Sequence, residues 1–89
     1  MILFSTSQIV RTYNKQISEF GKKGQWGVAL QFFHDMRKQE LVPNVITYTA
    51  SISACAKGKQ LQPALEIFGT MQQQGIVPNI ITYSALISA

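Results

Sequence analysis

The strongest constraint in this sequence is that it repeats itself every 35 residues. When residues 10–44 are laid over residues 45–79 without a gap, fifteen of the thirty-five positions are identical. The matching positions of the first unit are Val10, Thr12, Tyr13, Ile17, Ser18, Lys22, Gln25, Ala29, Leu30, Phe33, Met36, Gln39, Val42, Pro43 and Asn44. A fixed period of this length is typical of solenoids, in which each unit buries its apolar side only against its neighbours. The period therefore predicts an array of stacked units.

Each unit carries two apolar stripes at helical spacing, divided by glycines and ended by proline. Apolar residues at i, i+4 and i+7 predict a first helix over residues 11–21; they are Tyr13, Ile17 and Phe20. Residues 21–24 include two glycines that close this helix, and a second helix is predicted over residues 26–39. Pro43 cannot continue the ladder of helical hydrogen bonds, so the unit ends in a connector.

The repeat divides the chain into four segments. Residues 10–44 and 45–79 are full units, and residues 80–89 begin the first helix of a third. Pro63 fits the second unit, because proline costs little in the first turn of a helix. Residues 1–9 break the repeat and are predicted to be an irregular lead-in, although hydroxyl side chains within it can cap a slightly earlier helix start. We expect the chain to be a section of a longer array.

Composition indicates a folded chain with an uneven positive charge. Hydrophobic residues make up 46% of the sequence, and no apolar run approaches the length of about eighteen residues that indicates a membrane span. The first halves of the units hold six basic residues against Glu19, a net of +5. The second halves hold two basic residues against three acids, a net of −1. This placement favours an anionic partner facing the first helices.

Nothing in the sequence indicates an enzyme, a cofactor or a metal site. Cys55 is the only cysteine, which excludes an internal disulfide and a multi-cysteine metal site. The four acids are scattered, and no nucleophile is paired with a base. We interpret His34 as a surface residue and Cys55 as a small core residue. Neither a membrane nor a small-molecule substrate is expected as a partner.

Three motifs recur at matching places: Thr-Tyr opens the first helix, Ala-Leu-x-x-Phe-x-x-Met lies in the second, and Pro-Asn closes the unit. With them, residues 10–89 resemble the pentatricopeptide repeat; the Trp-x-x-Leu-Gly-x-x-Tyr opening of the tetratricopeptide repeat is absent. The resemblance implies an all-α fold, an α-solenoid of antiparallel helix-turn-helix repeats of 35 residues. It also implies sequence-specific binding of single-stranded RNA, about one base per repeat, in RNA metabolism of a mitochondrion or plastid. Residues 1–4 are too short an apolar run for a signal peptide, so we expect any targeting region to lie outside this chain or to be absent.

The resemblance further implies which side chains contact RNA. The expected base-reading pairs are Asn14 with Asn44 and Thr49 with Asn79. Ser84 is expected to begin a third pair, whose partner lies beyond residue 89. Amide and hydroxyl groups suit this role because they address Watson–Crick edges, and the family's tendencies favour a pyrimidine followed by adenine. Base sandwiching falls to Arg11, Ile46 and Ile81, where Arg11 departs from the family but can stack through its guanidinium plane. Phosphate binding falls to Lys22 and Lys57.

Other readings of the same residues stay open. The repeated threonines can simply start helices, the repeated tyrosines can pack between helices, and asparagine after proline is a good turn residue. The lysines can form a solvated face. At the level of function, the alternative to RNA binding is a helical scaffold for protein–protein interaction, which holds a protein segment in its groove.

Overall fold

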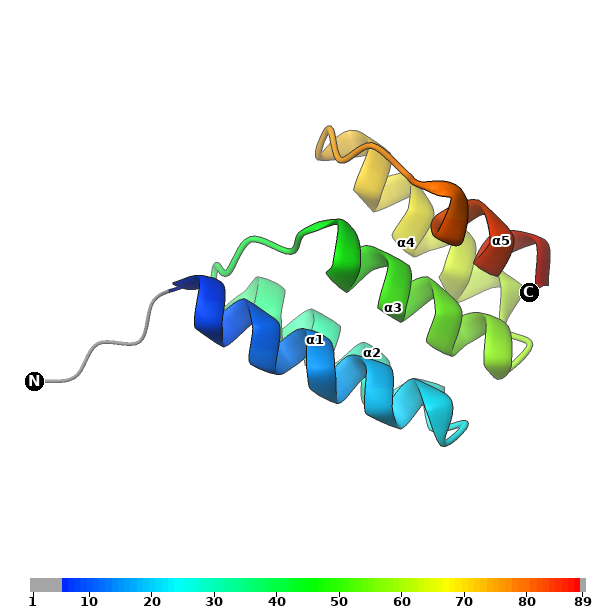
Figure 1. The fold of residues 1–89 in the computed structure, drawn as a ribbon, viewed down its shortest axis with the longest axis horizontal. Helices are drawn as coiled ribbons and strands as arrows, with labels where there is room; N and C mark the ends of the chain where they lie inside the picture. The colour runs from blue at the N-terminus through cyan, green and yellow to red at the C-terminus, as the bar shows by residue number, and fades with distance from the viewer. Residues whose placement is uncertain (1–5, 89) are drawn as a thin grey trace, which may run out of the picture.

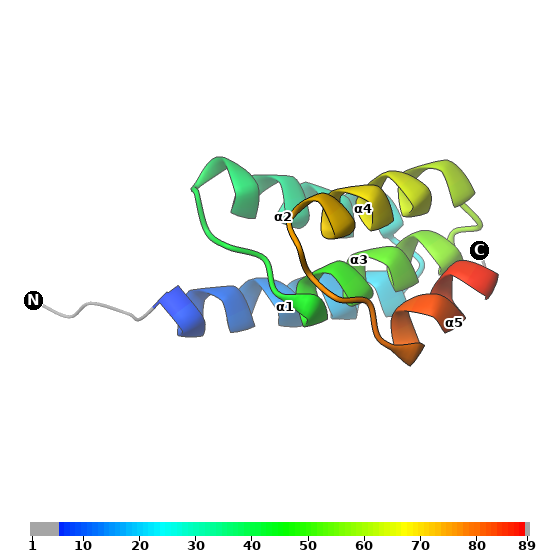
Figure 2. The same ribbon diagram turned by 90° about the horizontal axis from the view of Figure 1, so that it is seen from above.

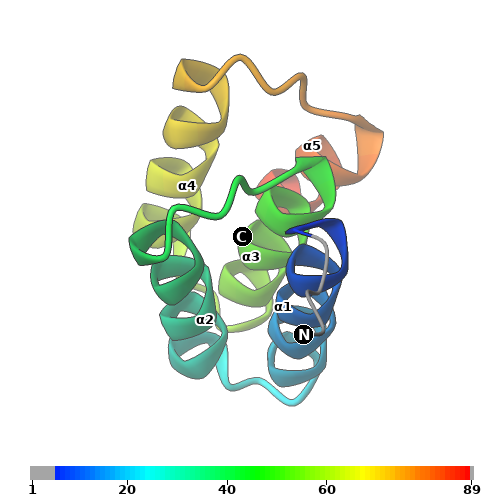
Figure 3. The same ribbon diagram turned by 90° about the vertical axis from the view of Figure 1, so that its left-hand side faces the viewer.

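The computed structural model describes residues 6–88, which form five α-helices in two layers. Figures 1 and 3 show α1 (Thr6–Lys22), α3 (Val45–Lys57) and α5 (Ile80–Ser88) side by side in one layer. The other layer contains α2 (Trp26–Lys38) and α4 (Leu61–Gln73), each antiparallel to the helix before it. No strand occurs within the described residues. The predicted class, an all-α solenoid of helix-turn-helix repeats, is confirmed.

The turns at the ends of α1 to α4 share one hydrogen-bond pattern, the Schellman motif. At the end of α1, the Gln25 amide donates to the Phe20 carbonyl over 2.9 Å and the Gly24 amide donates to the Gly21 carbonyl over 3.1 Å. Each motif needs one residue with positive φ, and the four are Gly24, Glu40, Lys59 and Gly75. Beyond the second and fourth motifs, residues 41–44 and 76–79 run as extended connectors to the next unit (Figure 2).

The hydrophobic core lies between the layers and crosses the boundary between units. Tyr48 of the second unit is 1% exposed, and its ring meets Phe33 of the first unit edge to face, with the centroids 5.5 Å apart. Burial raises the pKa of the Tyr48 phenol, an effect that the Arg37 charge partly offsets. For Tyr48, the structure supports the reading in which the repeated tyrosines pack between helices. Since its main partner comes from another unit, neither unit builds this part of the core alone.

Close helix contact explains why glycine stands at one position of α1. A Cβ atom on Gly21 would lie 2.8 Å from the Cβ of Ala54 in α3, closer than such atoms approach. Glycine therefore lets α1 and α3 pack tightly, which fixes the spacing of the first two units.

The structure corrects three predicted helix limits, one of which is the end of the first helix, at Lys22 and not at residue 21. α1 begins at Thr6, so the prediction of an irregular lead-in was wrong for residues 6–9, and residues 1–5 lie outside the described part of the chain. Pro43 lacks the backbone amide hydrogen that a helix needs, whereas Gln8, at the equivalent place of the first unit, has one, so α1 can begin earlier than α3. The second helix ends at Lys38, one residue before the predicted limit.

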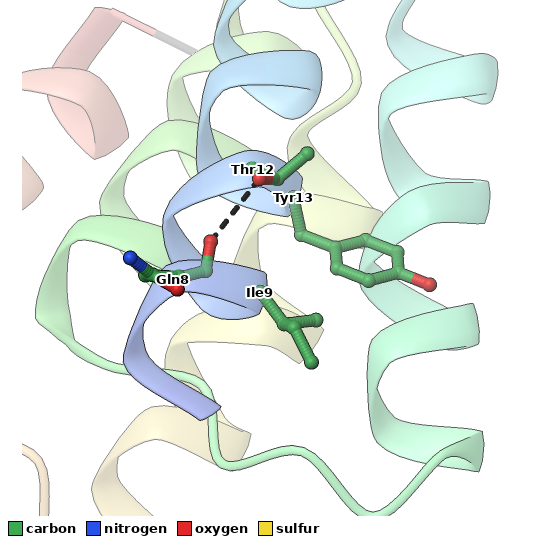
Figure 4. A pocket seen from close by; sticks show the side chains of 4 residues that line it. All are labelled: Gln8, Ile9, Thr12 and Tyr13. Atoms are coloured by element: carbon green, nitrogen blue, oxygen red, sulfur yellow. Dashed lines mark hydrogen bonds between the residues drawn. The ribbon is translucent and has the colours of Figure 1, made fainter. Parts of the chain in front are cut away.

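Both ends of the stack leave apolar side chains uncovered. At one end, a depression of about 220 Å³ is lined by Gln8, Ile9, Thr12 and Tyr13 (Figure 4). At the other end, Leu61, Leu65 and Ile87 are exposed. Across residues 6–88, none of the helices combines the length and the apolarity that crossing a bilayer requires.

Candidate nucleic-acid interface

The layer formed by α1, α3 and α5 presents the positive charge that the sequence places in the first halves of the units. All six of these basic side chains are exposed: Arg11, Lys15, Lys22 and Lys57 lie on α1 and α3, and Lys23 and Lys59 lie in the turns that follow these helices. We call this layer and its side chains the first-helix face. Its charge, with Glu19 as the one acid of these segments, suits a polyanion.

The predicted pair Asn14 and Asn44 meets at the junction between the first two units. Asn44 is the N-cap of α3: its Oδ1 accepts from the Thr47 amide over 3.0 Å, and its own amide donates to Thr47 Oγ1 over 3.2 Å. Asn14 in α1 donates from Nδ2 to Asn44 Oδ1 over 3.3 Å, and its Oδ1 accepts from the Thr47 hydroxyl. The structure therefore brings the two side chains into direct contact.

The second predicted pair, Thr49 and Asn79, is joined through a third residue. Asn79 Oδ1 accepts from the Thr82 amide over 2.9 Å, and the Asn79 amide donates to Thr82 Oγ1 over 3.3 Å. The hydroxyls of Thr49 and Thr82 are hydrogen-bonded over 2.8 Å. Thr49 thus reaches the network of Asn79 through Thr82, because its side chain is shorter than that of the equivalent Asn14.

Within each pair, one side chain is buried and the other is exposed. Asn14 and Thr49 retain only 6% and 9% of their exposure, whereas Asn44 and Asn79 face solvent. The two asparagines at the unit ends therefore present their amides at the surface, and the partners from α1 and α3 lie beneath them. The roles assigned to these four residues as base readers stay predictions.

The predicted sandwiching residues are exposed. Ile46 and Ile81 are each 59% exposed, and Arg11 also faces solvent. Each isoleucine comes two residues after one of the exposed asparagines, so an apolar surface and an amide lie close together along the chain. Ser84 is exposed as well, and its carbonyl accepts from the Ser88 hydroxyl over 3.1 Å.

The predicted phosphate-binding residues, Lys22 and Lys57, lie beside one another at the ends of α1 and α3. Lys57 Nζ donates to the Lys22 carbonyl over 3.3 Å, a contact that a helix C-terminus favours. An ammonium group has three donors, so two remain for an anion. The two lysines border a depression of about 230 Å³ between α1 and α3, which small residues such as Ser18 and Ser53 line.

Sequence reasoning left open that Thr47 and Thr82 start helices, but it missed that they join the two members of each reader pair. Both side chains are fully buried and contact both members of a predicted reader pair. The available signal was the spacing Asn-x-x-Thr, which fits the capping box of a helix N-terminus. Thr12, at the equivalent place, has Ile9 three residues before it and donates instead to the Gln8 carbonyl over 3.1 Å (Figure 4).

His34 and Cys55, which the sequence assigned to the surface and to the core, lie where they were expected. His34 is exposed, and Cys55 is fully buried. Desolvation raises the pKa of the Cys55 thiol to about 11, so it stays protonated at neutral pH. Among residues 6–88, no group of three or more His, Cys, Asp and Glu side chains is arranged to hold a metal ion.

Fold and surface together define a helical-repeat protein whose first-helix face combines basic, amide and apolar side chains. Two family models match the sequence: one described as PPR repeat over residues 11–41, and one described as Pentatricopeptide repeat domain over residues 31–89. The chain belongs to the pentatricopeptide repeat family. Its repeats form a helical scaffold, and membership is consistent with an RNA-binding repeat module. A search of curated proteins gave no match.

Proposed function

We propose that this chain is a sequence-specific module for single-stranded RNA that reads about one base per repeat and is not an enzyme. One observation carries the proposal: each predicted reader pair is joined in one hydrogen-bond network that ends in an exposed asparagine amide. The proposal includes a longer parent array that acts in RNA metabolism of a mitochondrion or plastid, as the family resemblance implies.

The surface around each amide supports base binding. Ile46 and Ile81 offer apolar area on which a base can stack, and Arg11 offers a guanidinium plane. An amide beside such an area can bond the edge of the stacked base, while Lys22 and Lys57 neutralise phosphates. In this arrangement the first unit takes a pyrimidine and the second takes adenine.

The free energies of stacking and association indicate that two repeats bind RNA weakly. Stacking contributes about 1–3 kcal/mol per base, whereas association costs roughly 4–15 kcal/mol. We therefore expect two bases to bind no more tightly than the millimolar range, and a longer array would be needed for tight binding.

An amide chemical-shift titration tests the proposal, because it tolerates weak affinity. Short RNAs carrying pyrimidine-adenine or adenine-pyrimidine, and a DNA equivalent, are added at low salt. We expect the largest shifts at Arg11, Asn14, Asn44, Ile46, Thr49 and Asn79, with the pyrimidine-adenine RNA. Shifts confined to the lysines, equal for every sequence, would contradict base reading and favour the protein-binding scaffold.

A further inference from the structure

We propose that Thr47 and Thr82 are positioning residues, which fix the side-chain amides of Asn44 and Asn79 and thereby set the base preference of the preceding repeat. The inference rests on the proposed RNA-binding function. It concerns two side chains that are fully buried and cannot themselves touch a base.

The capping bond decides which way each asparagine amide points. A backbone amide can only donate, so the atom that faces the Thr47 amide at 3.0 Å must be the oxygen of Asn44. The same holds for the Asn79 oxygen, 2.9 Å from the Thr82 amide. In both residues Oδ1 is thus directed to the helix N-terminus, and Nδ2 is left on the other side.

The threonine hydroxyl strengthens this orientation. Thr47 Oγ1 lies 3.0 Å from Asn44 Oδ1 and accepts from the Asn44 amide over 3.2 Å. In the next repeat, Thr82 Oγ1 makes the equivalent contacts to Asn79 over 3.0 and 3.3 Å. The single proton of Thr47 is donated to Asn14, so Thr47 Oγ1 holds Asn44 by accepting from its backbone amide. Thr82 Oγ1 accepts from the Asn79 backbone amide and can also donate to Asn79 Oδ1, since either hydroxyl can be the donor between Thr49 and Thr82.

The same hydroxyl also holds the buried partner of each pair. Thr47 donates to Asn14, and Thr82 is hydrogen-bonded to Thr49 over 2.8 Å. Both members of a pair are thus tied to one atom, and that atom belongs to the following repeat. The base preference of a repeat consequently depends on its neighbour as well as on its own sequence.

The orientation has a chemical consequence at the surface. With Oδ1 engaged and Nδ2 presented, the exposed asparagines offer donors and no acceptor. Such a site favours a base edge with a ring-nitrogen acceptor, such as N1 of adenine, over one with a ring N–H, such as N1 of guanine. If the hydroxyl is removed, the amide is held less firmly, so we expect this discrimination to weaken.

The test compares Thr82→Val with Thr82→Ser, which keeps the hydroxyl. Dissociation constants are measured by chemical-shift titration for two RNAs that carry adenine or guanine at the second base. We expect the wild-type chain to prefer adenine over guanine. In Thr82→Val this ratio should fall at least threefold, and in Thr82→Ser it should be retained. Thr47→Val is tested in the same way with cytosine against uracil at the first base, because cytosine N3 accepts and uracil N3–H donates.

Thr12→Val is the matched control. Thr12 holds the equivalent position in the first unit, but its hydroxyl bonds the Gln8 backbone carbonyl and no asparagine precedes it at capping distance. We expect unchanged base ratios for this variant. A valine variant that does not fold, as judged by its amide spectrum, is replaced by alanine at the same position.

The outcomes separate the two proposals. Folded Thr82→Val and Thr47→Val proteins that keep the wild-type base ratios would overturn the positioning role and leave both threonines as simple helix caps. A wild-type chain without any base preference would instead contradict the proposed function itself. A loss of affinity that is equal for both bases would also overturn the positioning role, since it would reflect stability alone.

Discussion

The two full units have the same helices and turns but form them in part with different residues. In the turn between the two helices of a unit, the residue with positive φ is Gly24 in the first unit and Lys59 in the second. In the turn at the end of a unit, it is Glu40 in the first unit and Gly75 in the second. Tyr48 is buried against the preceding unit, whereas the equivalent Tyr13 is only half-buried. The comparison shows that a side chain's role here depends on the neighbouring unit as much as on its place in the repeat.

The largest difference is expected between the two tyrosines. Tyr48→Ala removes a fully buried ring and should lower the free energy of unfolding by about 3–5 kcal/mol. Tyr13→Ala removes a half-buried ring that meets Phe32 and accepts a hydrogen bond from Gln39, so it should cost less than half as much. Urea unfolding of both variants measures the values. Equal losses would show that the first unit is as tightly packed as the second.

A smaller loss is expected where the two units make their closest contact. Gly21→Ala places a Cβ against Ala54, which should lower the free energy of unfolding by about 1–3 kcal/mol through overpacking. Gly27→Ala is the control, because a Cβ there meets no atom within 4 Å. Alanine at position 27 should stabilise the helix slightly. Thermal unfolding compares them, and a stabilised Gly21→Ala protein would show that α1 and α3 can move apart freely.

Exchanging the residues at positive φ should change stability in opposite directions. Glu40→Gly relieves a left-handed conformation that costs a non-glycine residue about 1–2 kcal/mol, partly offset by the greater freedom of glycine in the unfolded chain. We expect a gain of about 0.5–1 kcal/mol for Glu40→Gly and a loss of similar size for Gly75→Glu. Chemical denaturation checks both. A loss from Glu40→Gly would mean that its side chain contributes a stabilising contact.

The smallest effects concern the equivalent lysines on the first-helix face. Lys22→Gln and Lys57→Gln should each weaken RNA binding two- to threefold at low salt, because each removes a charge near phosphates. The salt slope should fall by about 0.7 per charge, the value for single strands. Lys38→Gln, in the other layer, makes the same charge change and should have less effect. Equal effects of all three would point to attraction by the net charge alone.

Local sequence rules accounted for most of the fold. The 35-residue period, the apolar stripes and the recurring Pro-Asn were enough to predict stacked helical hairpins, since each depends on residues close together in the chain. They also placed the start of α5 directly after Asn79, where it is observed. The first helix was predicted to begin at residue 11 because the repeat breaks before it, with only a slightly earlier start left open. α1 begins at Thr6, since Gln8 stands at the place of Pro43 and lets the helix continue.

The construction of the site follows from how the helices pack. The contacts of Asn14 with Thr47 and of Thr49 with Thr82 join residues 33 positions apart, so no local pattern shows them. The burial of Asn14 and Thr49 beneath exposed asparagines likewise follows from the packing of α1, α3 and α5. The residue types that recur in each unit can be recognised in the sequence alone. The stacking of one unit on the next determined which of those side chains meet, because each network is shared across a boundary between units.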